Sequence, residues 1–256
     1  MDEAQADAYL ARIGAVRPAA PTTEALADLT RRHLMTVPFE NLSIHLGEPI
    51  ELTEAALLAK IVDRRRGGFC YELNGALGML LTHLGYDVTL LAARVFNDDT
   101  AGPLFDHLAL RVACDGDWLV DVGFGKFVEA PVRLDVREPQ ADRAGEVLVA
   151  ETAEGDLDVA LAGARELRIE QRPRVLDDFV PTCWFQQTSP ASHFTRNVTC
   201  SLPTSYGRIT LAHRLLITTV DGQRTERVLT DDEVLPAYAE HFGLVLDRIP
   251  DAPRQS

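Results

Sequence analysis

The apolar residues of this chain change their period at Gly85, and this change limits the folds open to it. Before Gly85 they recur every three to four residues, as in helices; after it they alternate, as in strands. Four helices are expected first, with starts at Asp2, Thr22, Thr53 and about Cys70. Strands are then expected over 88–96, 107–113 and 118–124 and, as shorter pieces, over 133–174. Helices that precede strands instead of alternating with them indicate an α+β fold.

The last third of the chain combines one hairpin with two helices. A short helix is expected over 177–187, before Ser189-Pro190. Strands over 208–220 and 224–229 flank Asp221-Gly222, a pair typical of tight hairpin turns. A final helix is expected from a cap at Thr230 to Phe242, where Gly243 ends it.

The composition is that of an ordinary globular protein with an acidic balance. Of 256 residues, 46% are hydrophobic and 25% are charged, which permits one large domain or two to three small ones. The formal net charge of −14 argues against nucleic acid or an anionic membrane as a partner. The sequence contains neither an apolar signal segment at its start nor about 18 consecutive apolar residues. We therefore expect a cytoplasmic protein.

The four cysteines do not form a metal or redox motif. They are widely spaced, without a Cys-x-x-Cys pair, at positions Cys70, Cys114, Cys183 and Cys200. The histidines also lack the spacing of metal ligands. We expect a reduced thiol at Cys70 and no metal.

Cys70 stands at the junction between a glycine turn and a predicted helix. Residues 65–74 read Arg-Arg-Gly-Gly-Phe-Cys-Tyr-Glu-Leu-Asn. The free N–H groups and the positive dipole end of a helix start favour a thiolate over a thiol. For a lone cysteine a buried core position is the more common role. A catalytic role requires a histidine and a carboxylate or amide elsewhere in the chain.

His107 and Asp121 supply these two groups on successive predicted strands. Acyl transfer through a thiol requires a nucleophile, a base that holds its proton and a group that orients the base. Cys70, His107 and Asp121 are of these types and follow one another in the papain-like order. We expect them to form the catalytic site.

The turn between the two strands conflicts with such a site. Asp115-Gly116 predicts a two-residue turn, which would pair His107 with Phe124 and leave it three positions from Asp121. At roughly 10 Å the two side chains could not form a hydrogen bond. We therefore expect a longer loop over about 113–117, or a β-bulge, that moves the hairpin centre to about Cys114.

Five ordered motifs resemble those of the arylamine N-acetyltransferases, over nearly the whole chain. The first lies at 37–45 and includes Val-Pro-Phe-Glu-Asn-Leu, and the second is 66–72, around Cys70. His107 matches the family's histidine strand, and 120–125, Val-Asp-Val-Gly-Phe-Gly, match its aspartate motif. The segment 189–194, Ser-Pro-Ala-Ser-His-Phe, resembles a later motif of the family.

The resemblance implies a fold and a reaction. It implies an N-terminal helical bundle over 1–85 with the nucleophile, a central antiparallel β-barrel over 86–190 with His107 and Asp121, and a C-terminal α/β lid over 191–256. It also implies a papain-like cysteine core and ping-pong transfer of an acetyl or short acyl group from coenzyme A. A Cys70 thioester would be the intermediate, and an arylamine, arylhydroxylamine or hydrazine the acceptor.

Specific residues are expected to contact the substrates. Phe39 and Phe124 could stack on an aromatic acceptor, with core packing as their alternative role. The complete set expected at the substrate is Phe39, Phe69, Phe124 and Gly125. The residues expected at coenzyme A are Gly125 and Lys126.

Three other functions remain open from the sequence. A related amide synthase would use the same three residues to release or cyclise a polyketide chain, held by a carrier protein, onto an aromatic amine. Leu73 and Lys126, where the family often has other residues, could reflect a cleft reshaped for it. A papain-like hydrolase would leave the Pro-Phe-Glu-Asn and Val-Gly-Phe-Gly motifs unexplained. A binding module would have a Cys70 that is inert to iodoacetamide. The sequence does not indicate the oligomeric state.

Overall fold

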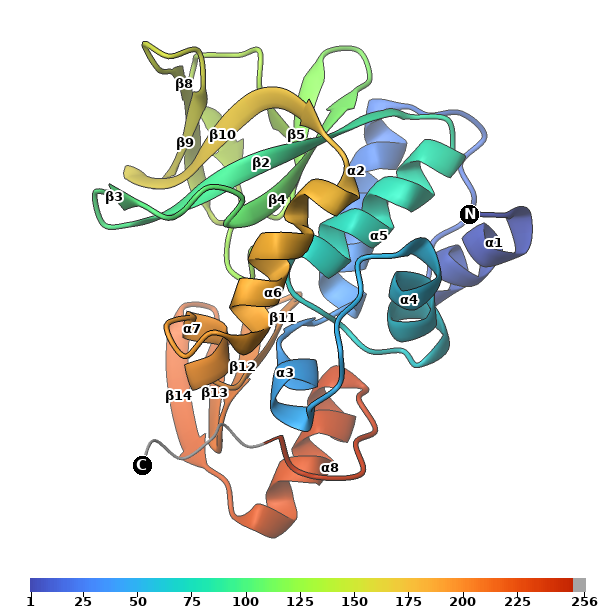
Figure 1. Cartoon of the computed structure of the whole chain (residues 1–256), viewed down its shortest axis with the longest axis vertical. Coiled ribbons are helices and arrows are strands. Elements are labelled where there is room, and N and C mark those ends of the chain that lie inside the picture. The colour runs from blue at the N-terminus through green and yellow to red at the C-terminus, as the bar shows by residue number, and fades with distance from the viewer. Residues whose placement is uncertain (251–256) are drawn as a thin grey trace.

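The computed structural model describes residues 1–250, and Figure 1 shows helices and a barrel side by side above a C-terminal part. The end of the expected lid, 251–256, lies outside the described residues. Helices come first, a curled antiparallel sheet follows, and a smaller sheet with one helix completes the fold. The α+β class is confirmed, with a nearly closed barrel between a helical part and an α/β part. The boundaries expected at 85/86 and 190/191 stay predictions.

Three of the N-terminal helices start where the sequence supplies a side-chain cap. Asp2 accepts a hydrogen bond from Gln5 N at 2.8 Å, and Thr22 and Thr53 cap their helices in the same way. The helices are α1 (Glu3–Arg12), α2 (Thr23–Thr36), α3 (Leu42–Leu46), α4 (Glu54–Leu58) with a π-helical turn (Ala59–Asp63), and α5 (Cys70–His83). The four predicted helices are confirmed, and the short α3 is additional to them.

The barrel sheet is antiparallel throughout. Its strands in spatial order are β6 (Val132–Arg133), β5 (Asp117–Val120), β4 (His107–Ala113), β2 (Asp87–Asn97), β10 (Ala164–Arg174), β9 (Leu157–Leu161), β8 (Gly145–Glu151) and β7 (Gln140–Asp142), with β3 (Thr100–Ala101) paired to β2. Strand β4 is buried on both faces, because Leu108 packs in the helical core and Ala109 in the barrel interior. The strand predicted over 118–124 is wrong in its second half, since β5 ends at Val120 and the chain turns toward α5.

Helix α5 lies between this sheet and the other N-terminal helices (Figure 1). Eleven of its 14 residues are buried, so the helix is covered on nearly all sides. Gly78 allows strand β4 to approach closely, because a Cβ there would lie 3.2 Å from Leu110 Cδ2. The helix that begins with Cys70 is thereby fixed against the strand that begins with His107.

The C-terminal part is a second antiparallel sheet with helix α8 (Asp231–Phe242) packed on it. Its strands in order are β1 (Phe39–Glu40), β11 (Thr199–Thr204), β12 (Gly207–Ala212), β13 (Leu215–Val220) and β14 (Gln223–Val228). The single strand predicted over 208–220 is wrong, because His213, with φ 53°, turns the chain between β12 and β13. The hairpin at Asp221-Gly222 and the end of α8 at Gly243 are confirmed.

Strand β1 joins the first part of the chain to the last. Phe39 pairs with Ser201 of β11 and also bridges to Gly68, and Glu40 N donates to Gly68 O at 2.8 Å. Two short helices, α6 (Val180–Thr188) and α7 (His193–Arg196), connect the barrel to this sheet (Figure 1). The loop before Cys70 is therefore held by the C-terminal sheet.

Candidate active site

Cys70 is the first residue of α5 and is only 3% exposed. Glu72 accepts a hydrogen bond from Phe69 N at 3.2 Å, which satisfies one of the free N–H groups of the helix start. The Cys70 thiol lies 4.0 Å from the carbonyl oxygen of Asp106, to which it donates. The junction predicted between a glycine turn and a helix is confirmed, with the thiol at the helix N-terminus.

Two glycines allow the loop before Cys70 to pass between β1 and α5. A Cβ at Gly67 would lie 1.9 Å from Pro38 O, and a Cβ at Gly68 would lie 2.8 Å from Glu72 Cβ, which is fixed to the helix backbone. Neither contact is compatible with a side chain, so both positions require glycine. The loop is fixed by the strand on one side and by the helix cap on the other.

Two buried ion pairs support this loop. Lys60 Nζ lies 2.6 Å from Glu72 Oε1, and Arg66 Nη2 lies 3.0 Å from Glu40 Oε1. Burial raises the pKa of Glu72. Burial acts in the same direction on Glu40, but Lys60 and Arg66 hold the pKa of that carboxyl below its usual value. These charges satisfy one another, and their role is to position the start of α5.

His107 begins β4, and its ring is bound to Asp121. Nε2 of His107 lies 2.6 Å from Oδ2 of Asp121, and both residues are buried. Burial alone would lower the pKa of His107, but Asp121 and Cys70 raise it well above its ordinary value. Because Nε2 faces the carboxylate, Nδ1 is the ring nitrogen left for the hydrogen bond with Cys70. The structure brings the three predicted residues together in the order thiol, imidazole, carboxylate.

The β4–β5 hairpin has the longer loop that this arrangement requires. The facing pairs are Leu110 with Val120 and Ala113 with Asp117, so three residues, 114–116, form the loop. The hairpin centre lies at Asp115, one residue later than expected. Continued by one residue, this register sets Asp121 opposite position 109, on the diagonal from His107. The structure therefore lacks the two-residue turn that Asp115-Gly116 predicts, and its register allows His107 to contact Asp121.

Asn74 and Gly123 orient Asp121, and neither is identified by the sequence analysis. Asn74 Nδ2 and Gly123 N donate to Asp121 Oδ1 at 2.8 and 2.9 Å. Gly123 also allows the loop after β5 to touch α5, since a Cβ there would lie 2.5 Å from Cys70 Cα. A signal for Asn74 was present in the sequence, because it follows Cys70 by four residues and so lies on the same helix face.

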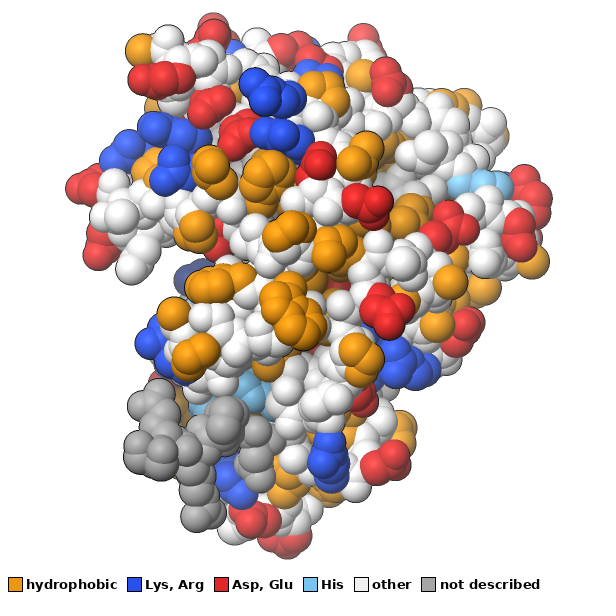
Figure 2. Space-filling model, viewed as in Figure 1, with side chains coloured by type: hydrophobic (Ala, Val, Ile, Leu, Met, Phe, Trp, Pro, Cys, Tyr) orange, Lys and Arg blue, Asp and Glu red, His pale blue; other side chains and the backbone are white. Residues whose placement is uncertain are grey.

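Cys70 and His107 line a cavity of about 600 Å³. Figure 2 shows a notch in the surface between the β2–β3 hairpin and helices α6 and α7. Residues of β2, of the loop after β3 and of the two helices line the cavity. The aromatic lining residues are Phe39, Phe96, Phe124, Phe185 and Phe194. The other polar lining residues are Asn97, Asp106, Gln186, Ser192, His193 and Arg196. Aromatic walls with a few convergent polar groups are typical of a small-molecule site.

The residues expected at the substrates are distributed inside and outside this cavity. Phe39 lines it, and Phe124 lies edge-on to His107 with ring centroids 5.5 Å apart. Phe69 is fully buried behind the wall and packs on the ring of Phe194. Gly125 and the exposed Lys126 do not belong to the cavity lining. The binding roles expected for all five residues stay predictions.

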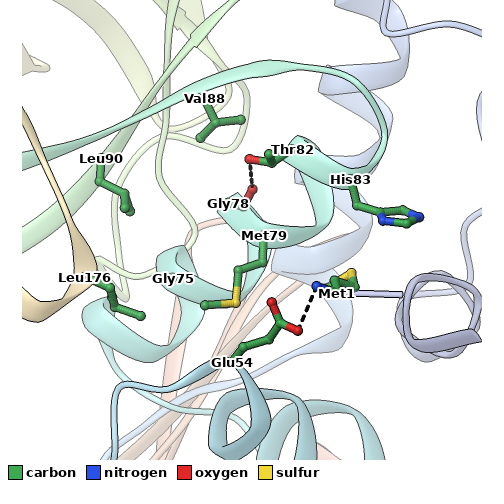
Figure 3. A pocket seen from close by; sticks show the side chains of 10 residues that line it. All are labelled: Met1, Glu54, Gly75, Gly78, Met79, Thr82, His83, Val88, Leu90 and Leu176. Carbon is green, nitrogen blue, oxygen red and sulfur yellow. Dashed lines mark hydrogen bonds and ion pairs between the residues drawn. The ribbon is translucent and has the colours of Figure 1, made fainter. Parts of the chain in front are cut away.

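A second cavity, of about 400 Å³, lies along another side of α5 (Figure 3). Its walls are mostly apolar, and the helix contributes Gly75 and Gly78 to them. Glu54 and the N-terminal ammonium of Met1 form an ion pair at its edge, 2.7 Å apart. Because no cysteine lines this cavity, the thiol chemistry belongs to the first one.

Comparison with known proteins assigns the chain to a class. A family model described as N-acetyltransferase matches residues 22–251. The arylamine N-acetyltransferase of Mycolicibacterium smegmatis is 37% identical over 255 residues, 93% of this chain and 91% of the relative. A solved structure of the M. smegmatis enzyme superposes with a TM-score of 0.87 at 34% identity, covering 95% of this chain and 92% of that one. The enzyme of Mycobacterium marinum, solved in complex with CoA, gives 0.85 at 32% identity, with 93% and 92% covered.

The fold and these likenesses define an acetyltransferase. More narrowly, the chain belongs to the arylamine N-acetyltransferase family, and the amide-synthase alternative is not favoured. Within residues 1–250 no cluster of side chains is suited to hold a metal ion. In the same range no helix combines the length and the apolar character needed to cross a membrane.

Proposed function

We propose that this protein transfers an acetyl group from acetyl-coenzyme A to an arylamine, arylhydroxylamine or hydrazine, with Cys70 as the carrier. The observation that supports it most is that Cys70 and His107 line one aromatic cavity, while Asp121 forms a hydrogen bond with Nε2 of His107. Family membership supports the same reaction. A location in the cytoplasm, and a carrier protein as partner in the case of an amide synthase, stay predictions.

In the first half-reaction His107 takes the proton of Cys70, and the sulfur attacks the thioester carbonyl carbon of acetyl-coenzyme A. The bond from that carbon to the coenzyme A sulfur breaks, and the departing thiolate receives the proton from His107. The raised pKa of His107 supports this role, because the imidazolium is stabilised by Asp121 while it holds the proton.

In the second half-reaction the amine nitrogen attacks the acetyl carbon on Cys70, and His107 accepts a proton from that nitrogen. The carbon–sulfur bond breaks, the product amide forms, and the Cys70 sulfur recovers its proton from His107. The low exposure of Cys70, 3%, limits access of water to the thioester and so favours the amine as acceptor.

The cavity offers separate groups for the two substrates. Its phenylalanines, with Phe124 beside His107, are suited to stack on an aromatic acceptor. Among the described residues that line the cavity, Arg196 is the only lysine or arginine, and it is suited to the diphosphate of coenzyme A. A direct contact of Gly125 or Lys126 with coenzyme A would require a binding mode that extends beyond this cavity.

Mass spectrometry tests the proposal in two steps. Mixed with acetyl-coenzyme A and no acceptor, the wild-type protein should gain the mass of one acetyl group, on the peptide that contains Cys70. Addition of para-anisidine should then remove the acetyl group and release the acetylated amine. A Cys114→Ser variant, altered at a cysteine outside the cavity, is the matched control and should behave like the wild type. Absence of the acetyl group, or its presence on another residue, would contradict the proposal.

A further inference from the structure

Within residues 1–250, Asp106 is the only acidic residue that lines the cavity of Cys70 and His107. It directly precedes His107, and its carbonyl oxygen accepts hydrogen bonds from the Cys70 thiol and the Tyr71 hydroxyl. The backbone of Asp106 is thus part of the surroundings of the thiol. Its side chain is half-buried, and Gln186, which contacts the carboxylate, lines the same cavity.

The carboxylate of Asp106 is held in place by hydrogen bonds but can accept more of them. Gln186 Nε2 donates to Oδ1 at 3.0 Å, and Ser192 Oγ donates to Gln186 Oε1 at 2.6 Å, which fixes the orientation of the amide. Gly102 leaves room for the second oxygen, because a Cβ there would lie 2.4 Å from Oδ2. A carboxylate accepts about four hydrogen bonds, whereas the donors found for it within the described part of the chain are Gln186 and the backbone of Val95. Capacity for a donor on a bound molecule remains.

The surroundings of Asp106 leave its charge incompletely solvated. Burial raises the pKa of Asp106 above its ordinary value, although His107, the backbone of Val95 and Gln186 act against the rise. A donor or a positive charge on a bound molecule would therefore stabilise the carboxylate. A second carboxylate in the same cavity would be repelled with little screening by solvent.

We propose that Asp106 determines which arylamines the cavity accepts, favouring acceptors with a neutral hydrogen-bond donor or a positive charge over acceptors with a carboxylate. This inference rests on the proposed acetyl transfer and adds an acceptor class to it. Asp106 acts here through direct contact with the acceptor, and its clamp to Gln186 serves to keep the carboxylate at the cavity wall.

The test compares two acceptors of nearly equal shape, para-aminobenzamide and para-aminobenzoate. For the wild type we expect a higher kcat/KM with the amide. The variant Asp106→Asn removes the charge but keeps an oxygen that can accept from Gln186. It should reduce the amide-to-benzoate ratio of kcat/KM by about ten- to hundredfold, chiefly by improving para-aminobenzoate.

Two further variants separate charge from structure. Gln186→Leu removes the hydrogen bond that positions Asp106 but keeps the charge, so it should reduce the preference for the amide less than Asp106→Asn does. Glu146→Gln makes the same change of net charge at an exposed position on β8 and should match the wild type in ratio and rate. An Asp106→Asn variant with the wild-type ratio, or with both acceptors slowed equally, would overturn the inference. Acetylation of para-anisidine but of neither compound by the wild type would overturn the inference alone. Acetylation of none of the three amines would overturn the proposed function, and the inference with it.

Discussion

The thiol of Cys70 is the single group on which the proposed chemistry depends most directly. Serine is nearly the same size, so Cys70→Ser should leave the packing at the start of α5 intact. His107 can support a thiolate far more readily than an alkoxide. We expect acetyl transfer to fall by more than about a thousandfold, with unchanged circular dichroism and an unchanged urea midpoint. Activity above a few per cent of wild type would remove Cys70 from the mechanism.

Asp121 acts through His107, so its replacement should lower the rate of acetyl transfer without abolishing it. In Asp121→Asn the amide keeps one oxygen for Asn74 and Gly123 but no longer stabilises the imidazolium. The loss is about 10⁴-fold in serine proteases, and we expect a smaller one here, because papain-like enzymes function with a neutral partner. Single-turnover acetylation of Cys70, measured by quenched mass spectrometry, reports this step. A wild-type rate would assign the orienting role to another residue.

The residues with a distinctive local context could be predicted from the sequence, and the others could not. Cys70 follows a glycine turn, His107 begins a strand with a clear period, and Asp121 directly follows the next strand. Asp106 and Gln186 are of types common on any surface, and only the folded chain brings them together across 80 positions. Their place in the cavity therefore has no signal in a single sequence.

Among the elements, the β4–β5 hairpin shows how tertiary contacts override a local turn preference. Asp115-Gly116 favours a two-residue turn, but the observed loop includes Cys114 as well. The loop after β5 is tied to α5 by Asn74, which bonds both Val122 N and Asp121. This anchor lies 47 residues before Asp121 in the chain, beyond the range of any local pattern.

The contact between that loop and α5 can be tested at Gly123. In Gly123→Ala the new Cβ would meet Cys70 Cα at 2.5 Å, and backbone atoms cannot move aside as a side chain can. We expect a loss of about 1–3 kcal/mol in the free energy of unfolding in urea. Acetyl transfer should fall by at least about tenfold, because Asp121 moves with the loop.

Gly75→Ala is the matched control for this substitution. It also adds one methyl group to a glycine at α5, but its nearest neighbours are the flexible ends of Leu57 and Leu176, at 3.2 and 3.4 Å. Alanine favours a helix interior over glycine by about 0.5–1 kcal/mol, so the stability should change little or rise. Equal losses of stability and of acetyl transfer in the two variants would show that the close contact between Gly123 and Cys70 does not cause the effect.

In the whole molecule, the cavity is formed where three distant stretches of chain meet. Phe39 comes from the first part, His107 from the barrel and Phe194 from the connection to the C-terminal sheet. Strand β1, two residues long, makes this possible, because it ties Phe39 to Ser201 and to Gly68. The order of helices and strands could be read from the sequence, whereas a two-residue strand that joins both ends of the chain is too short to carry a pattern.

Two buried histidines give the stability of the whole molecule opposite dependences on pH. Burial, aided by Arg12, lowers the pKa of His33 to about 3, so below about 6.5 the unfolded chain binds a proton that the folded chain does not. Stability should therefore fall as the pH drops from about 6.5. The pKa of His107 is raised when folded, mainly by Asp121. Its contribution is complete below about 6.5 and is lost as the pH rises through the folded-state value.

The two dependences predict a maximum of stability near pH 6.5. His33 causes the loss of stability below this pH, and His107 causes the loss above it. Urea unfolding between pH 4 and 9 measures how the unfolding free energy changes with pH on each side of this maximum, over about 2.5 units either way. For one proton the change is at most about 1.4 kcal/mol per pH unit. His33→Gln can still bond the Tyr9 hydroxyl, which lies 3.0 Å from His33 Nε2, and it should flatten the acid side while leaving the alkaline side unchanged. His107→Gln should flatten the alkaline side only. If the unfolding free energy falls equally steeply with decreasing pH in the wild type and in His33→Gln, other groups, such as the buried Glu40, control unfolding in acid.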